Sequence, residues 1–94
     1  MAYLITHFYE GGTVEQYETV VAAVHPPGGL PAGQTYHAAG PAEGGWLIAA
    51  VWDSEAAFDT FAAQTLMPAL HDLEGGFAGP PQQRACEVAN LLTA

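Results

Sequence analysis

The sequence predicts an α+β domain in which helices cover one face of a four-stranded antiparallel sheet. Its 94 residues, 1–94, are enough for a single domain with one hydrophobic core. Apolar residues alternate with a period of two in four short runs and recur at helical spacing in two others. In chain order these runs read β-α-β-β-α-β.

The first strand is predicted over Tyr3–Tyr9, where both faces are largely apolar. One face carries Tyr3, Ile5, His7 and Tyr9. After Gly11 and Gly12, the residues "TVEQ" predict a capping box in which the Thr13 hydroxyl accepts from the Gln16 amide and Gln16 reaches back. The helix that follows has an apolar stripe and ends at His25-Pro26, where we expect a surface histidine. The stripe consists of Val14, Tyr17, Val21 and Val24.

A hairpin is predicted from "QTYHAA" and "WLIAAVW", which the turn cluster "GPAEGG" separates. If the turn is centred between Ala42 and Glu43, His37 lies opposite Ile48. The same face then carries Trp46, Ala50 and Trp52. A slip of one residue would reverse every assignment, because side chains alternate between the faces of a strand.

The second helix begins with "DSEAAFDTF", where Ser54 is the expected N-cap and Glu55 and Asp59 lie near the positive helix end. Phe58, Phe61 and Ala62 recur at helical spacing. Pro68 predicts a break or the start of a second short helix. A last strand is expected in "RACEVANLL".

This order of elements is the ferredoxin-like pattern, in which right-handed crossovers place the first and third strands at the centre of the sheet. The face without helices would carry apolar side chains, and the whole chain is 50% hydrophobic and 12% charged. We therefore expect two sheets to pack face to face in a homodimer. The side chains concerned are Leu4, Phe8, Leu47 and Val51.

Composition excludes several classes of partner. The formal net charge is −9, the chain contains no lysine, and Arg84 is its one arginine, so neither nucleic acid nor an anionic membrane is an expected partner. Cys86 is alone, which is typical of a reducing compartment. The start "MAYLITHFYE" lacks a basic n-region, so we expect neither a signal peptide nor a membrane span there, and we expect a cytoplasmic protein.

Histidines and aromatic residues are the candidate site residues. His7, His37 and His71 could meet Trp52 and Phe61 in one pocket beneath the helices. Neutral imidazoles can remove a proton from a phenol or from a carbon next to a carbonyl, and Tyr36 or Tyr9 could donate a hydrogen bond to the resulting oxyanion. The three histidines lie on separate elements without metal-ligand spacing, so we do not expect a metal site.

The stretch "VWDSEAAFDTF" followed by "LMPALH" resembles the dimeric α+β barrel superfamily, which contains antibiotic-biosynthesis monooxygenases, haem-degrading monooxygenases and cofactor-free polyketide cyclases. The resemblance implies a homodimer that oxygenates or cyclises an aromatic or polyketide-like small molecule without a cofactor. His7 and His71 are then the expected acid–base pair, while His37, Trp52, Phe61, Tyr36 and Tyr9 bind the substrate.

Two alternatives remain open. The haem-degrading branch has a helix aromatic and an iron-ligating histidine ten residues apart, and Phe61 and His71 resemble them. That match implies a haem cofactor with His71 on the iron. The third reading is a non-catalytic binding or stress module, because a fold does not by itself fix a chemistry.

Overall fold

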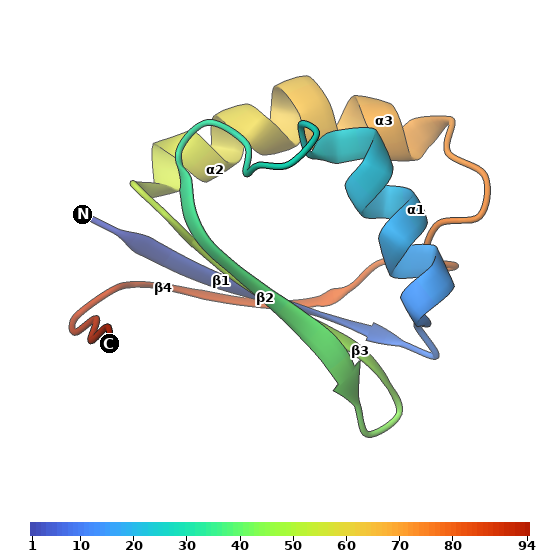
Figure 1. The fold of residues 1–94 in the computed structure, drawn as a ribbon, viewed down its shortest axis with the longest axis horizontal. Coiled ribbons are helices and arrows are strands. Elements are labelled where there is room, and N and C mark those ends of the chain that lie inside the picture. The colour runs from blue at the N-terminus through green and yellow to red at the C-terminus, as the bar shows by residue number, and fades with distance from the viewer.

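The computed structural model describes all residues from Met1 to Ala94 and has the predicted element order (Figure 1). Its elements are β1 (Tyr3–Glu10), α1 (Val14–Val24), β2 (Gln34–Ala42), β3 (Gly45–Trp52), α2 (Glu55–Phe61), the π-helical segment η1 (Ala62–Leu66), α3 (Met67–His71) and β4 (Gln82–Glu87).

The four strands form one antiparallel sheet in the order β2-β3-β1-β4, so the first and third strands lie at its centre as expected. Tyr3 pairs with Trp52 and His7 with Ile48 along the central pair. Both helical segments lie above the same face of the sheet, and the face beneath carries no helix (Figure 1). The ferredoxin-like α+β prediction is confirmed.

Both predicted helix starts are confirmed in their hydrogen bonds. The Thr13 hydroxyl accepts from the Gln16 amide at 3.2 Å, and the Thr13 amide donates to the Gln16 side chain at 3.0 Å, which completes the capping box. The Ser54 hydroxyl accepts from the Ala57 amide at 3.1 Å. These caps satisfy backbone donors that an open helix end would leave unpaired.

In the β2–β3 hairpin, residues 36–42 of β2 pair with β3 residues two positions later than predicted. Ala42 pairs with Gly45, so Glu43 and Gly44 form the turn, and Gly44 adopts a φ of +84° that favours glycine. His37 therefore pairs with Ala50, and the predicted pairing with Ile48 was wrong. Because side chains alternate with period two, a shift of two residues keeps His37 on the predicted face.

The second helical segment continues without a break through Pro68. Proline cannot donate a backbone hydrogen bond, and its ring would collide with the carbonyl four residues earlier in a regular α-helix. The structure widens into the π-helical segment η1 just before this point and then forms α3, the expected short second helix, with Pro68 in its first turn.

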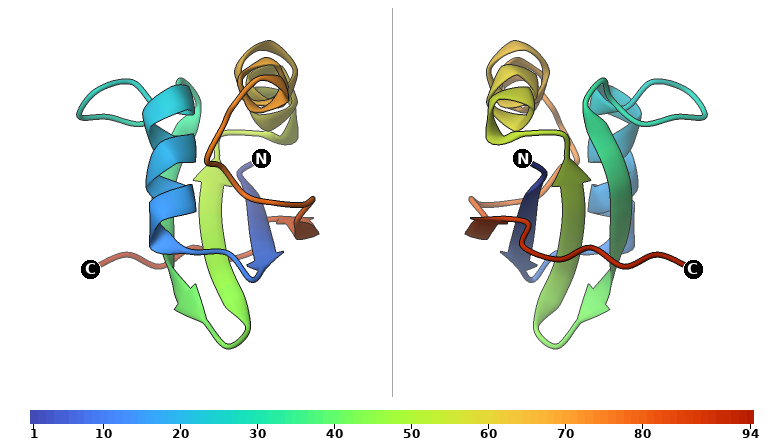
Figure 2. Two further views of the ribbon diagram at one scale, coloured as in Figure 1. Left: turned by 90° about the vertical axis from the view of Figure 1, so that its right-hand side faces the viewer. Right: turned by 90° about the vertical axis from the view of Figure 1, so that its left-hand side faces the viewer.

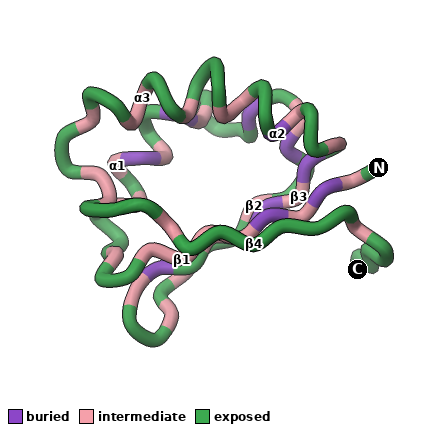
Figure 3. The backbone as a smooth tube through the Cα atoms, turned by 180° about the vertical axis from the view of Figure 1, so that it is seen from behind, coloured by how far each residue is buried: buried purple, intermediate pink, exposed green.

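The last strand was predicted too late in the chain. It begins at Gln82 and ends at Glu87, after which the Val88 amide makes one more backbone bond, to Ala2. The residues that follow cross from the β4 side of the sheet to the side of β2 (Figure 2). Every residue of β4 is exposed (Figure 3).

The hydrophobic core lies between the sheet and α2. It consists of Tyr3, Ile5, Ala50, Trp52 and Phe58. Only 10 of the 94 residues are buried, which is a thin core even for a chain of this size. None of the helices has the length and apolar character that crossing a bilayer requires.

Candidate functional site

A narrow cavity of about 60 Å³ lies between the helix-covered face of the sheet and the helices themselves. Most of its wall is apolar and includes Ile5, Ile48, Val20 and Phe58. No carboxylate and no lysine or arginine lines it. Six polar or ionisable side chains do, namely His7, Tyr9, Tyr17, His25, Gln34 and His37.

Three of these polar side chains form a hydrogen-bonded chain that joins α1 to β2. The Nδ1 atom of His37 lies 3.1 Å from the Gln34 side-chain oxygen, and its Nε2 atom lies 2.6 Å from the Tyr17 hydroxyl. A carbonyl oxygen only accepts, so Nδ1 carries the imidazole proton and donates to Gln34. Nε2 is then the unprotonated nitrogen, and the Tyr17 hydroxyl donates to it.

An irregularity in β2 makes this chain possible. The register shifts between Gln34, which pairs with Trp52, and Tyr36, which pairs with Val51. Strict alternation would place Gln34 and His37 on opposite faces of the strand. The extra residue at Thr35 brings both to the cavity face, in agreement with the way β-bulges re-aim side chains.

His25 packs on His37 and helps to keep it neutral. The two rings meet edge to face, with centroids 4.9 Å apart. Burial lowers the pKa of His37 below its ordinary value, and the neighbouring His25 lowers it further. Burial also lowers the pKa of His25. Both imidazoles are therefore neutral at pH 7, and each has one nitrogen that can accept a proton.

His7 lies on the far side of the cavity from His37. Its Nε2 atom lies 3.0 Å from the Gln83 side-chain oxygen on β4, so Nε2 donates and Nδ1 is unprotonated. Burial lowers the pKa of His7, and the bond to Gln83 opposes this in part. One strand, β3, lies between the strands of His7 and His37. Two strand spacings and an offset of two residues place their Cα atoms roughly 12 Å apart.

Three further predicted residues line the cavity. Trp52 is 1% exposed, and its indole N–H has no hydrogen-bond partner. A buried donor without a partner costs about 1–3 kcal/mol, which an acceptor on a ligand would recover. Phe61 packs on Trp52 with ring centroids 5.0 Å apart. Tyr9 stacks on Phe77 at 3.8 Å, and burial raises its pKa.

Two predicted residues lie elsewhere. The His71 side chain is 84% exposed at the end of α3, lies 4.0 Å from Asp72, and does not line the cavity. The expectation that it shares a cavity with His7 was wrong, because the helix continues through η1 and does not swing over the sheet. Tyr36 is 48% exposed and does not line the cavity either, because it alternates with His37.

Sequence reasoning missed Tyr17, Gln34 and His25 as site residues. Tyr17 was assigned to the apolar stripe of α1, and His25 was expected at the surface. His25 does cap α1, since its amide bonds to the Val21 carbonyl, but its ring lines the cavity. A polar hydroxyl within an otherwise aliphatic stripe was the available signal for Tyr17.

A haem does not fit this site. The expected iron ligand, His71, is exposed and lies outside the cavity, so no side chain of the predicted haem pair except Phe61 lines it. The structure also has no group of three or more histidine, cysteine, aspartate or glutamate side chains placed to hold a metal ion. Two of the three imidazoles that line the cavity, those of His7 and His37, are hydrogen-bonded to a tyrosine and to glutamines instead.

Three solved structures superpose on nearly the whole of this chain. A protein from Chloroflexus aurantiacus assigned to the antibiotic-biosynthesis monooxygenases superposes with a TM-score of 0.68 at 11% identity, over 99% of this chain and 98% of the other. SnoaB, a cofactor-independent oxygenase from Streptomyces nogalater, superposes with a TM-score of 0.62 at 18% identity, over 99% and 97%.

A third structure, the monooxygenase ActVA-Orf6 of Streptomyces coelicolor, is a complex with nanaomycin D. It superposes with a TM-score of 0.58 at 21% identity, over 99% of this chain and 91% of the other. No protein-family model matches the sequence, and no curated protein matches it. The likeness therefore concerns the fold: this chain has the ferredoxin-like α+β fold that is seen in these antibiotic-biosynthesis monooxygenase-like structures.

Proposed function

We propose that this protein is an enzyme that deprotonates an aromatic or polyketide-like small molecule and so promotes its oxygenation or cyclisation without a cofactor. The hydrogen-bonded chain Tyr17–His37–Gln34 at the cavity wall is the observation that carries the proposal. Two proteins of the same fold, SnoaB and ActVA-Orf6, are described as a cofactor-independent oxygenase and a monooxygenase.

Proton removal follows from the geometry of the chain. As the Tyr17 hydroxyl passes its proton to Nε2 of His37, its oxygen can take a proton from a phenol or from an activated C–H of the substrate. The proton ends on His37, and the Nδ1–H bond to Gln34 keeps the imidazolium oriented. Burial lowers the pKa of His37 and so keeps it free to accept at pH 7. The unpartnered indole N–H of Trp52 would stabilise the substrate oxyanion.

Both reactions begin with the same substrate carbanion. In oxygenation, a CH₂ carbanion gives one electron to dioxygen, and the two radicals combine into a peroxide. Protonation of the peroxide and loss of water leave a ketone, so that CH₂ and O₂ become C=O and H₂O. In cyclisation, the carbanion attacks a carbonyl of the same molecule and forms a C–C bond. His37 returns the proton in either case.

His7 is the second proposed acid–base group. It faces the same cavity from β1, about 12 Å from His37, so an aromatic ring can lie between the two imidazoles. His71 is no longer proposed as its partner, because its exposed side chain does not reach the cavity.

A non-catalytic binding module is the second candidate, because the inner cavity is too small to enclose a whole substrate beside the histidines. Ligand sites for molecules of drug size usually measure about 300–1,000 Å³, whereas this cavity measures about 60 Å³. Binding without turnover would leave the ligand chemically unchanged. Product analysis therefore distinguishes the two candidates.

The test is turnover of hydroxylated bicyclic and tricyclic aromatic ketones by metal-free protein, followed by oxygen uptake and mass spectrometry of the products. Removing a general base should lower kcat by about 10²–10⁴. We expect that loss in both His37→Gln and Tyr17→Phe, since each breaks the proton relay, and full activity in the control His71→Gln. Equal activity of His37→Gln and wild type would reject the mechanism.

We further propose that the protein is a homodimer that packs through the bare face of the sheet. That face carries Leu4, Phe8, Leu47 and Val51, and Leu47 is 41% exposed. Two such apolar faces would cover each other.

A cytoplasmic location is also proposed, because Cys86 is exposed and unpaired, as is usual in a reducing compartment.

A further inference from the structure

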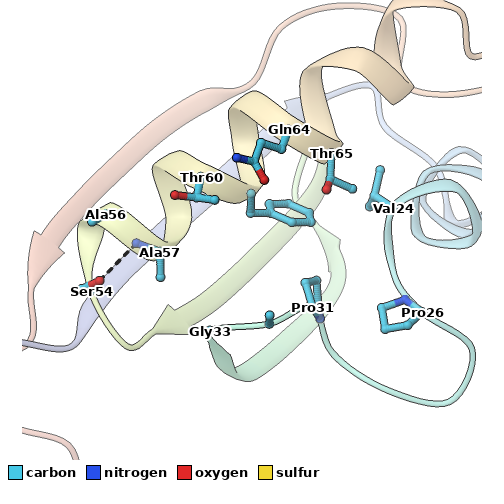
Figure 4. A pocket seen from close by; sticks show the side chains of 12 residues that line it. Val24, Pro26, Pro31, Gly33, Ser54, Ala56, Ala57, Thr60, Gln64 and Thr65 are labelled. Carbon is cyan, nitrogen blue, oxygen red and sulfur yellow. Dashed lines mark hydrogen bonds between the residues drawn. The ribbon is translucent and has the colours of Figure 1, made fainter.

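A second hollow lies outside the cavity, between the loop before β2 and the helical segment α2–η1. This outer groove is open and measures about 660 Å³. Figure 4 shows its two walls: Pro26, Pro31 and Gly33 lie on the loop side, and Thr60, Gln64 and Thr65 project from the helical side.

The outer groove and the inner cavity share two wall residues, Phe61 and Val24. Phe61 also packs on Trp52, which is the most deeply buried residue of the cavity wall together with Ile5. The Phe61 ring is therefore part of the wall that separates the open groove from the indole, and displacing it would open a path between the groove and the cavity.

The chemistry of the groove indicates a neutral ligand. None of its 12 lining residues is charged at neutral pH. The side chains of Thr60, Gln64 and Thr65 form no hydrogen bond within the chain, so their polar groups are free to bind a ligand. The opposite wall is apolar, with Val24, Pro26 and Pro31. Gln64 and Thr65 lie in the π-helical segment, a kind of turn often found at functional sites.

We propose that the outer groove is a second binding subsite, which holds the unreactive part of a neutral, ring-containing molecule while Phe61 controls passage of its reactive end into the cavity. The identity of that reactive end rests on the proposed function; the route past Phe61 does not. The subsite explains how a cavity of about 60 Å³ could serve a ligand several times larger.

The test measures how freely the neutral quencher acrylamide reaches Trp52. Trp46→Phe leaves Trp52 as the one tryptophan, and its 1% exposure predicts weak quenching. Adding Phe61→Ala should raise the quenching constant by at least about threefold, because a path from solvent opens. The matched control is Phe58→Ala: Phe58 also packs on Trp52, at 5.6 Å, but does not line the groove. Equal quenching in the two variants would overturn the proposal.

Three further quenching experiments test the path to Trp52 and the charge that the groove prefers. Gln64→Phe added to Phe61→Ala should at least halve the increase in the quenching constant, since the phenylalanine fills the groove. Phe77→Ala, at the opposite end of the cavity beside Tyr9, should change quenching little. With iodide as quencher, Phe61→Ala should raise the quenching constant less than half as much as with acrylamide, because no cationic side chain lines the groove.

An undiminished increase with Gln64→Phe, or an equal increase with Phe77→Ala, would contradict the path through the groove. Equal effects of iodide and acrylamide would contradict the preference for a neutral ligand. Circular dichroism melts identify variants that unfold, and Phe61→Leu replaces Phe61→Ala if the latter does not fold. The measurement needs no turnover, so a lack of activity on every aromatic ketone would reject the proposed function and leave this result standing.

Discussion

Acidification from pH 7.5 to 5.5 should destabilise the fold through its cavity-lining histidines. Burial lowers the folded-state pKa of His7, His25 and His37 below the ordinary value of 6.5. The unfolded chain therefore binds protons more readily than the folded chain once the pH falls through 6.5. Stability is present above that pH and is lost below it.

The size of the loss follows from the same linkage. A histidine that stays neutral in the folded state and titrates at 6.5 in the unfolded state removes about 1.4 kcal/mol between these pH values, so three remove about 4 kcal/mol at most. His25 and His37 are only partly buried, and solvent screening should roughly halve the total, to about 2 kcal/mol. For a domain of this length, that lowers Tm by about 8–16 °C.

The assay is thermal unfolding followed by circular dichroism at fixed protein concentration in 150 mM salt. Salt screens the repulsion that the net charge of −9 causes and that acidification would relieve. The groups that face these histidines are Tyr17, Gln34, Gln83 and one another, with no carboxylate on the cavity wall. The control His71→Gln should keep the full pH difference. A Tm at pH 5.5 equal to or above that at pH 7.5 would refute the reasoning.

Three other predictions concern the cap, a turn and the open face of the sheet. Thr13→Ala should lower the Tm by about 4–8 °C through loss of about 1 kcal/mol of capping, and Thr13→Ser should restore it. Gly12→Ala should cost about 1–3 kcal/mol in denaturant unfolding. Its Cβ would lie 2.9 Å from the Trp46 Cβ, whereas Gly29→Ala meets nothing within 4 Å and should be nearly neutral. Leu47→Lys should convert the proposed dimer to a monomer in light scattering; a wild-type monomer would contradict the dimer.

The fold could be predicted from the sequence because its signals are local. The capping residues Thr13 and Ser54, the two hydrophobic periods and the turn glycines each act within a few residues, and all appear in the structure. The hairpin register differs from the predicted one by two residues, and His37 still lies on the predicted face because side chains on a strand alternate with a period of two.

The site was harder to predict because it depends on irregular backbone and on docking. The bulge at Thr35 brings Gln34 to the face of His37, and no residue type in "GQTYH" requires a bulge there. The Tyr17–His37 bond joins residues 20 positions apart and depends on how α1 lies on β2. The π-helical segment keeps the helix continuous through Pro68, and His71 therefore lies at the exposed end of α3. A break at Pro68 would have placed His71 elsewhere.

The central claim is that His37 is a neutral base held between Gln34 and Tyr17, and proton–nitrogen correlation NMR of the histidine rings tests it most directly. The account predicts that His37 carries its proton on Nδ1 at pH 7 and titrates below 6.5. Tyr17→Phe should change its Nε2 resonance and leave that of His71 unchanged. A proton on Nε2 at pH 7, or a His37 that is already charged at pH 6.5, would contradict the account.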